Sequence, residues 1–172
     1  MLAPDPTFVM YRIYAMQAHV RYASVPLHAD FTLDVEALVA EIARQKPALV
    51  WLASPNNPTG RAIPAAAIER VLAAAPGLVV VDEAYADFAG TTLVPRVLEF
   101  PNLVMRTLSK VGLAGARLGY AVGHPAWIGE LDKVRSPYNV NALTQAVVPV
   151  ILGAADAMAA QAAGIGPAMI PT

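Results

Sequence analysis

A single lysine, Lys110, lies in the stretch TLSKVGLAGARLGY (107–120), which otherwise consists largely of small and apolar residues. Two hydroxyl residues, Thr107 and Ser109, come shortly before it, and Arg117 follows seven positions later. A lysine that only keeps a surface soluble needs neither hydroxyls before it nor glycines after it. This setting instead predicts a buried segment in which the lysine amine forms a covalent bond.

Two other polar clusters follow apolar runs of the chain. The run LVVVDE (78–83) contains a carboxylate, Asp82, with Tyr85 three positions further on, and the run ALVWLA (48–53) leads into SPNNPTG (54–60). A carboxylate at the end of a buried strand is suited to a cationic partner, because an opposite charge in a dry site favours the ionised pair. Asp82 is therefore a candidate for binding a positively charged group.

The segments that carry these residues alternate between strand and helix patterns. The predicted strands are 19–25, 48–53, 78–83, 103–108 and 117–123, and the predicted helices are 34–45, 64–75, 125–134 and a segment from about residue 141. Asp34 is placed to cap the first of these helices, and Pro64 suits the first turn of the second. Strands alternating with helices indicate an α/β fold with a central, mostly parallel sheet and flanking helices.

All three polar clusters come just after predicted strands. Ligands bind at the carboxyl ends of the strands in open parallel sheets, so strands that share one sheet would bring the clusters to one edge. Each cluster alone also fits a structural role: NPTG is a common turn, an Asp-Glu pair at a strand end is often solvated, and a lone lysine is usually on the surface. Their order and spacing together favour a binding site.

The composition argues against several other kinds of protein. The 172 residues suffice for one domain with a core, and the net charge is −1 without a basic stripe for nucleic acid. The absence of cysteine excludes disulfides and thiolate metal sites, and it fits a reducing compartment. The three histidines, His19, His28 and His124, show no metal-ligand spacing.

Hydrophobic residues make up 56% of the chain and charged residues 15%. No secretory signal is visible at the N-terminus. The most apolar region is interrupted by Pro149 and reaches Asp156, well short of the roughly 18 apolar residues that a membrane span needs. The apolar excess therefore predicts either a chain that is mostly interior or an apolar surface that packs against a partner or a missing segment.

Four stretches carry a resemblance to a known family: PTFVMYRIYA, SPNNPTG, VVVDEAYADF and RTLSKVGLAGARLGYAVG. In this order and spacing they resemble the fold-type I pyridoxal-phosphate aminotransferases, and within them most of all the histidinol-phosphate aminotransferases. The resemblance covers roughly residues 4–150 and implies the large domain of these enzymes. In many relatives one more residue separates the lysine from the arginine, and the shorter gap here leans toward the histidinol-phosphate subtype.

The resemblance implies a role for each polar residue. Lys110 bonds pyridoxal 5'-phosphate, Asp82 keeps its ring nitrogen protonated, and Tyr85 with Asn57 holds its phenolic oxygen; Lys110, Asp82 and Tyr85 are the implied catalytic residues. Phe8 stacks on the ring, while Thr107, Ser109 and Arg117 bind the phosphate. The implied cofactor-binding set is thus Phe8, Asn57, Asp82, Tyr85, Thr107, Ser109, Lys110 and Arg117, with no metal.

The implied reaction is amino-group transfer between L-glutamate or 2-oxoglutarate and imidazole-acetol phosphate in L-histidine biosynthesis. The implied enzyme is a cytoplasmic homodimer that acts on small amino acids and 2-oxo acids and has neither a nucleic-acid nor a membrane partner. Two alternatives stay open. One is another enzyme of this fold type, such as an aromatic aminotransferase or a threonine-phosphate decarboxylase, and the other is a catalytically silent truncated module.

Parts of the family pattern are not visible in this sequence. In the family, an earlier segment carries a glycine-containing phosphate loop and a tyrosine that reaches the neighbouring subunit, and a later small domain carries an arginine that binds the substrate carboxylate. We therefore expect residues 1–150 to form a partial cofactor-binding large domain. Residues 151–172 would be an apolar tail that starts the connection to a small domain, with its last dozen residues poorly ordered or lying against a partner.

Overall fold

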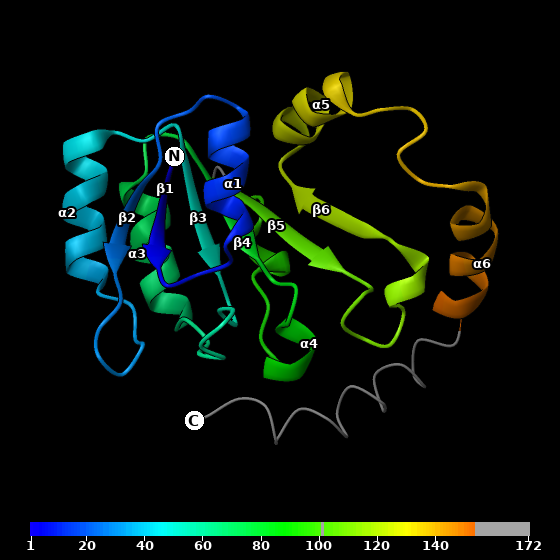
Figure 1. Ribbon diagram of the computed structural model, residues 1–172, viewed down its shortest axis with the longest axis horizontal. Coiled ribbons are helices and arrows are strands. Elements are labelled where there is room, and N and C mark those ends of the chain that lie inside the picture. The colour runs from blue at the N-terminus through cyan, green and yellow to red at the C-terminus, as the bar shows by residue number, and fades with distance from the viewer. Residues whose placement is uncertain (101, 154–172) are drawn as a thin grey trace.

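The computed structural model describes residues 1–100 and 102–153, and the predicted tail beyond these ranges lies outside the described residues. Six strands form one sheet in the order β2-β1-β3-β4-β5-β6 (Figure 1). The strands are β1 (Leu2–Asp5), β2 (Ala23–Pro26), β3 (Leu49–Ala53), β4 (Leu78–Asp82), β5 (Asn102–Thr107) and β6 (Gly119–Gly123). All neighbouring pairs are parallel except β5 with β6, which is antiparallel. The predicted mostly parallel α/β fold is therefore confirmed.

Helices cover both faces of the sheet. They are α1 (Met10–Gln17), α2 (Val35–Gln45), α3 (Ala65–Ala74), the single-turn α4 (Ala86–Ala89), α5 (Pro125–Val134) and α6 (Ala142–Leu152). On one face, α2 and α3 pack on the alternate strand residues Val50, Leu52, Val79 and Val81. On the other face lies α1 (Figure 1), which packs Tyr11 against Ala3 and Ala53 and also buries Ala15. No helix of the described part is long and apolar enough to cross a membrane.

Local signals in the sequence account for the helix α2. The carboxylate of Asp34 accepts a hydrogen bond from the backbone N–H of Ala37 at 2.9 Å, as predicted for a capping residue. Leu38 and Ile42, four positions apart, are fully buried on one side of the helix. Burying each such side chain stabilises the fold by about 1.5–3 kcal/mol. Pro64 differs slightly from its prediction, since it precedes the first helical residue of α3 instead of lying in the first turn.

Two elements of the N-terminal region, β1 and α1, were not predicted from the sequence. β1 has only four residues, and Pro4 within it has no N–H to donate, so the strand lacks the pattern of a central strand although it is one. α1 begins at Met10, its capping position Val9 provides no side-chain hydrogen bond, and its first turn has no acidic residue. These missing signals matter, because both elements build the candidate site.

The prediction that the stretch 107–120 is buried was wrong. Lys110, Arg117 and half of the residues between them are exposed, as is Tyr120 in β6. The physical reason is position: β6 is the edge strand, and the turn that joins it to β5 projects from that edge. Gly112 in this turn has a φ of 89°, a conformation that glycine adopts at little cost.

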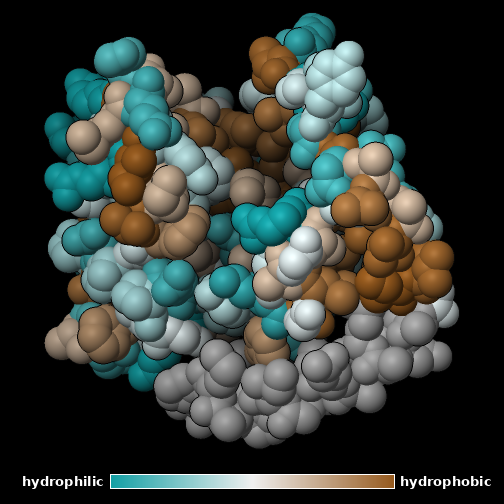
Figure 2. All heavy atoms as spheres, turned by 45° about the vertical axis from the view of Figure 1, so that its right-hand side comes forward, coloured by the Kyte–Doolittle hydropathy of each residue, from teal (hydrophilic) through white to brown (hydrophobic). Residues whose placement is uncertain are grey.

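The helix α6 lies beyond β6, away from the other strands (Figure 1), and it carries a patch of exposed apolar side chains. In α6, Leu143 is 78% exposed and Val150 is 76% exposed, with Val147 and Leu152 also exposed. Figure 2 shows hydrophobic side chains gathered on the side of the molecule where α6 lies. The hydroxyl of Thr144 ties α6 to the turn before β6 by donating a hydrogen bond to the carbonyl of Ala116, at 2.7 Å.

We expect this patch to drive self-association of the isolated chain, because large uncovered apolar patches rarely stay solvated. Sedimentation should give a mass above the 18.1 kDa of one chain, rising with protein concentration. The double substitution Leu143→Glu with Val150→Glu should restore a monomer, whereas Val9→Glu, at a similarly exposed valine of the other flank, should not. A wild-type chain that sediments as a monomer at every concentration would contradict the expectation.

Candidate active site

The carboxyl ends of β1, β3, β4 and β5 meet at one edge of the sheet. Ala53 and Asp82 are paired across β3 and β4, and Asp82 and Met105 are paired across β4 and β5. The backbone is bonded just beyond these positions as well: Ser54 N–H donates to the carbonyl of Asp82 at 2.9 Å, and Glu83 N–H donates to the carbonyl of Met105 at 2.8 Å. The loops that follow the strands therefore start from fixed points, and the predicted convergence of the three polar clusters is confirmed.

A cavity lies between these loops and α1. Its volume is about 350 Å³ with its open mouth included. The lining residues are Phe8, Tyr11, Ala53, Pro55, Asn57, Asp82, Ala84, Tyr85 and Lys110. Five of the eight residues that the sequence analysis singled out, Phe8, Asn57, Asp82, Tyr85 and Lys110, are thus brought together from four separate segments of the chain.

Asp82 is held at the floor of this cavity by two hydrogen bonds. The hydroxyl of Tyr11 donates to Oδ2 at 2.7 Å, and the backbone N–H of Ala84 donates to Oδ1 at 3.0 Å. Each carboxylate oxygen has two lone pairs, so both oxygens keep acceptor capacity for a further donor. A carboxylate that is fixed by two donors and can still accept further hydrogen bonds is suited to binding a cationic donor.

Lys110 and Tyr85 face each other across the mouth of the cavity. The ammonium nitrogen Nζ of Lys110 lies 5.1 Å from the centroid of the Tyr85 ring, within the range of a cation–π contact. Lys110 is exposed, so its amine can be reached from solvent. An accessible amine beside a fixed carboxylate, in an aromatic-lined cavity, can bond a carbonyl carbon while the carboxylate binds a positive group of the same molecule.

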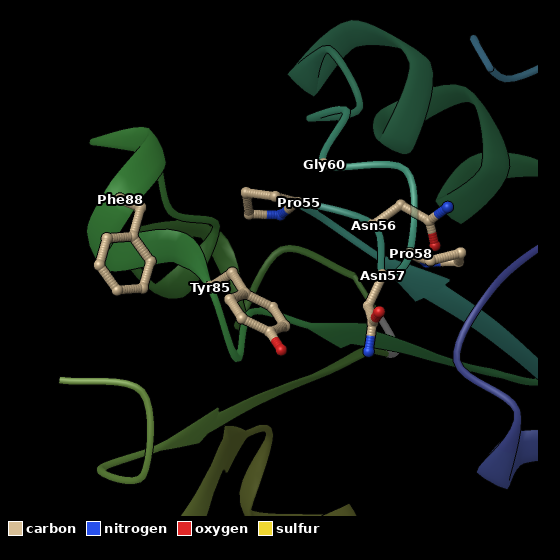
Figure 3. Close-up of a pocket in the computed structure, with 7 residues that line it drawn as sticks. All are labelled: Pro55, Asn56, Asn57, Pro58, Gly60, Tyr85 and Phe88. Atoms are coloured by element: carbon tan, nitrogen blue, oxygen red, sulfur yellow. The ribbon is translucent and has the colours of Figure 1, made fainter. Parts of the chain in front are cut away.

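Asn57 and Tyr85 also line a second cavity, which adjoins the first (Figure 3). In Figure 3 the amide of Asn57 and the hydroxyl of Tyr85 point toward the same space, with Pro55 above them in the view and Phe88 further out. Two donors directed at one point can bind a single anionic or carbonyl oxygen. The second cavity thus extends the site toward α4.

Asn56, which the sequence analysis did not single out, fixes the loop that carries Asn57. Its buried amide accepts a hydrogen bond from the Thr7 hydroxyl at 2.7 Å and donates to the carbonyl of Pro6 and to the Thr59 hydroxyl, each at 3.0 Å. These bonds tie the segment after β3 to the segment after β1. The loop is therefore rigid for a structural reason, and Asn57 is left free to face the cavity.

The possibility that both acids of the Asp-Glu pair are solvated is wrong for Glu83. Glu83 is 3% exposed and accepts hydrogen bonds of 2.6 Å from the Leu93 N–H and from the Thr92 hydroxyl. Nε of Arg106 lies 3.8 Å from Oε2 of Glu83. Period-two alternation explains the difference: Asp82 ends β4 facing α1, and the next residue turns to the opposite side. Glu83 holds the 92–93 loop and does not face the cavity.

Three of the singled-out residues do not line the cavity. The Thr107 hydroxyl donates to the carbonyl of Leu118 at 3.2 Å and accepts from the Ser109 N–H at 3.1 Å, so it closes the turn between β5 and β6. Arg117 is exposed, and its guanidinium donates to the Ala114 carbonyl at 3.4 Å. The residues that line the cavity are therefore suited to contact a ring, whereas the three residues expected to bind a phosphate lie outside the lining.

Other kinds of site find little support in the part of the chain that the structure describes. In residues 1–100 and 102–153, no group of three or more metal-ligating side chains is placed to hold a metal ion. His28 is paired with Asp34 at 3.9 Å on the surface, away from the cavity.

Comparison with known proteins agrees with the geometry. Residues 1–165 match the family model described as aminotransferase class I and II. The chain is 55% identical over 166 residues to histidinol-phosphate aminotransferase 1 of Burkholderia lata, covering 95% of this chain and 46% of that protein. It is 54% identical over 168 residues to histidinol-phosphate aminotransferase 1 of Ralstonia nicotianae, covering 94% of this chain and 45% of that protein.

A solved structure is similar in fold as well. The histidinol-phosphate aminotransferase of Sinorhizobium meliloti, in complex with pyridoxal-5'-phosphate, superimposes with a TM-score of 0.83 at 29% identity. The match covers 94% of this chain and 46% of that one. The present chain thus spans about half the length of the relatives that it matches.

Proposed function

Because the chain belongs to the aminotransferase class I and II family, we propose that it supplies the cofactor-binding half of a histidinol-phosphate aminotransferase. The reaction would be amino-group transfer between L-glutamate or 2-oxoglutarate and imidazole-acetol phosphate, a step of L-histidine biosynthesis. One observation carries the proposal: Lys110, Asp82 and Tyr85 line a single cavity at the carboxyl edge of the sheet. The 55% identity to a relative named for this activity supports the choice of substrate.

The donor set of the cavity fits the ring end of pyridoxal 5'-phosphate. Asp82, held by Tyr11 and Ala84, offers a carboxylate oxygen for a protonated ring nitrogen. Asn57 and Tyr85 offer donors for the phenolic oxygen, and Phe8 offers an aromatic face. When bound, this cofactor supplies an electrophilic carbon and an electron-withdrawing ring.

The residues of the chain would divide the remaining work. Lys110 Nζ would hold the cofactor covalently until a substrate amine replaces it, and the freed amine would then move a proton between the substrate α-carbon and carbon C4′ of the cofactor. Asp82 would hold the proton on the ring nitrogen by charge. Thr107, Ser109 and Arg117 would bind the phosphate after a change in the β5–β6 turn, since their present partners are backbone carbonyls and each other.

We further propose that residues 1–150 form the cofactor-binding domain and that the rest begins a connection to a second domain. α6 runs through position 150 to Leu152 without a break, so the connection would start from a helix. The active form would be a homodimer in the cytoplasm. The exposed apolar patch on α6 and the cysteine-free composition are compatible with these two points.

A substrate comparison on the whole protein tests the substrate assignment. Glutamate with imidazole-acetol phosphate should give the highest kcat/KM, ahead of glutamate with phenylpyruvate. Faster turnover of phenylpyruvate would identify an aromatic aminotransferase instead, and release of carbon dioxide from threonine phosphate would identify a decarboxylase. Absence of any visible or near-ultraviolet absorbance change with added pyridoxal phosphate would favour a catalytically silent module.

The isolated 172-residue chain should bind pyridoxal phosphate weakly and should not transaminate measurably. Only the ring end of the site is assembled, because Arg117, Thr107 and Ser109 do not line the cavity. Each charge-assisted hydrogen bond that the phosphate fails to make costs about 1.5–3 kcal/mol, so the affinity falls by orders of magnitude. The measurements are a cofactor absorbance titration and a coupled glutamate assay at saturating cofactor. Turnover by this chain alone would show that it holds a complete site.

A further inference from the structure

Tyr11 is a cavity residue to which the sequence analysis assigned no role. Its hydroxyl donates a hydrogen bond of 2.7 Å to Oδ2 of Asp82, a residue 71 positions further along the chain. Tyr11 comes from α1 and Asp82 from the end of β4, so this bond joins a helix to the sheet at the floor of the cavity.

The ring of Tyr11 is fixed on both sides, which leaves its hydroxyl little freedom of position. Tyr11 is 1% exposed. Its ring stacks on Trp51, with centroids 4.5 Å apart and planes at 13°, and it meets Phe8 edge-on at 5.6 Å and 83°. An aromatic ring packed in this way can hold a carboxylate in one orientation.

In the hydrogen bond between Tyr11 and Asp82, the tyrosine hydroxyl is always the donor and the carboxylate is always the acceptor. Burial raises the pKa of Tyr11 far above its ordinary value, and the charge of Asp82 and the hydrogen bond to it act in the same direction. Tyr11 therefore stays protonated at every working pH and always donates.

We propose that Tyr11 is a positioning residue, which holds the Asp82 carboxylate in one orientation, turned toward the protonated ring nitrogen of a bound pyridine cofactor. The inference rests on the proposed function. It assigns Tyr11 no contact with substrate. It also explains why α1, a helix without a side-chain cap, buries a tyrosine against the only carboxylate in the cavity lining.

The test compares two ligands that differ at one atom: pyridoxal phosphate, and its 1-deaza analogue, in which a C–H group replaces the ring nitrogen. Equilibrium dialysis at up to millimolar ligand gives the ratio of their affinities for the 172-residue chain, so weak binding suffices. The variants are Tyr11→Phe and, as a matched control, Tyr14→Phe, an exposed tyrosine of the same helix. Asp82→Asn serves as the reference in which the preference should vanish.

The wild-type chain and Tyr14→Phe should prefer pyridoxal phosphate. Tyr11→Phe should lower that preference by about fivefold, the equivalent of one ordinary hydrogen bond, and leave the affinity for the analogue unchanged. Equal weakening of both ligands in Tyr11→Phe would show a merely structural role and overturn the inference, as would an unchanged preference. No preference in the wild-type chain would overturn the proposed function, and the inference with it.

A second measurement does not depend on how the phenylalanine variant folds. In the unsubstituted chain labelled with carbon-13 at the tyrosine Cζ, the Tyr11 resonance is found by replacing the other five of the six tyrosines one at a time. It should move when pyridoxal phosphate is added and stay in place with the 1-deaza analogue. A Tyr11 resonance that responds equally to both ligands, or to neither, would overturn the inference.

Discussion

Lys110→Arg is expected to abolish covalent capture of pyridoxal phosphate by this chain and to lower transamination by the whole protein by several orders of magnitude. Arginine keeps the positive charge and the approximate length of lysine, but its guanidinium stays protonated and cannot act as a nucleophile. The loss would therefore report on the amine itself. Capture is measured by borohydride reduction of the chain with millimolar cofactor, followed by peptide mass spectrometry.

The other two lysines of the chain provide internal controls. Lys46 follows α2 and precedes β3, so it lies at the amino end of the sheet, opposite the cavity. Lys133 in α5 is paired with Glu130 at 2.6 Å on the surface. Lys46→Arg and Lys133→Arg should leave capture unchanged. A reduced label found on Lys46 or Lys133 in the wild-type chain, at a level matching Lys110, would remove the basis for assigning the bond to Lys110.

The parts of the fold that the sequence predicts well are those whose signals are local. The apolar runs at 48–53 and 78–83 correspond to β3 and β4 within one residue at each end, because strands buried on both faces need uninterrupted apolar residues. Asp34 and Asn141 both cap helices, at α2 and α6. The convergence of the site follows from these strands, since parallel neighbours end at the same edge.

The parts that the sequence does not predict depend on contacts between distant segments. β1 has only four residues, one of which is a proline. It forms a strand because it pairs with β2 on one side and β3 on the other. The link between Tyr11 and Asp82 spans 71 positions and leaves no local signature. The exposure of 107–120 likewise depends on what packs beside β6.

Asp82→Asn is the second large effect expected, and Glu83→Gln is its neighbouring control. The asparagine keeps the shape of the side chain and can still accept a hydrogen bond from Tyr11, but it carries no charge to hold a protonated ring nitrogen. Loss of an electrostatic partner of this kind costs on the order of 10²-fold or more in turnover. We expect kcat of the whole protein to fall by that amount in Asp82→Asn, while its free energy of unfolding changes little.

The control should behave in the opposite way, because Glu83 has a different task. Its carboxylate is buried and accepts the bonds from Leu93 and Thr92, and neither group belongs to the cavity. Glu83→Gln should lower the free energy of unfolding by about 1–3 kcal/mol, since a buried charged acceptor is lost. Turnover per folded molecule should stay within a few-fold of wild type.

Measuring both quantities on both variants separates the two roles. Urea unfolding gives the stability, and kcat of the folded fraction gives the chemistry. Suppose that Asp82→Asn and Glu83→Gln reduced turnover equally at equal stability. The assignment of Asp82 to the ring nitrogen would then be wrong. The strand register, which turns Asp82 toward α1 and Glu83 away from it, would not decide which carboxylate takes part in the reaction. A large loss confined to Asp82→Asn follows only if one carboxylate of the adjacent pair faces the reacting group.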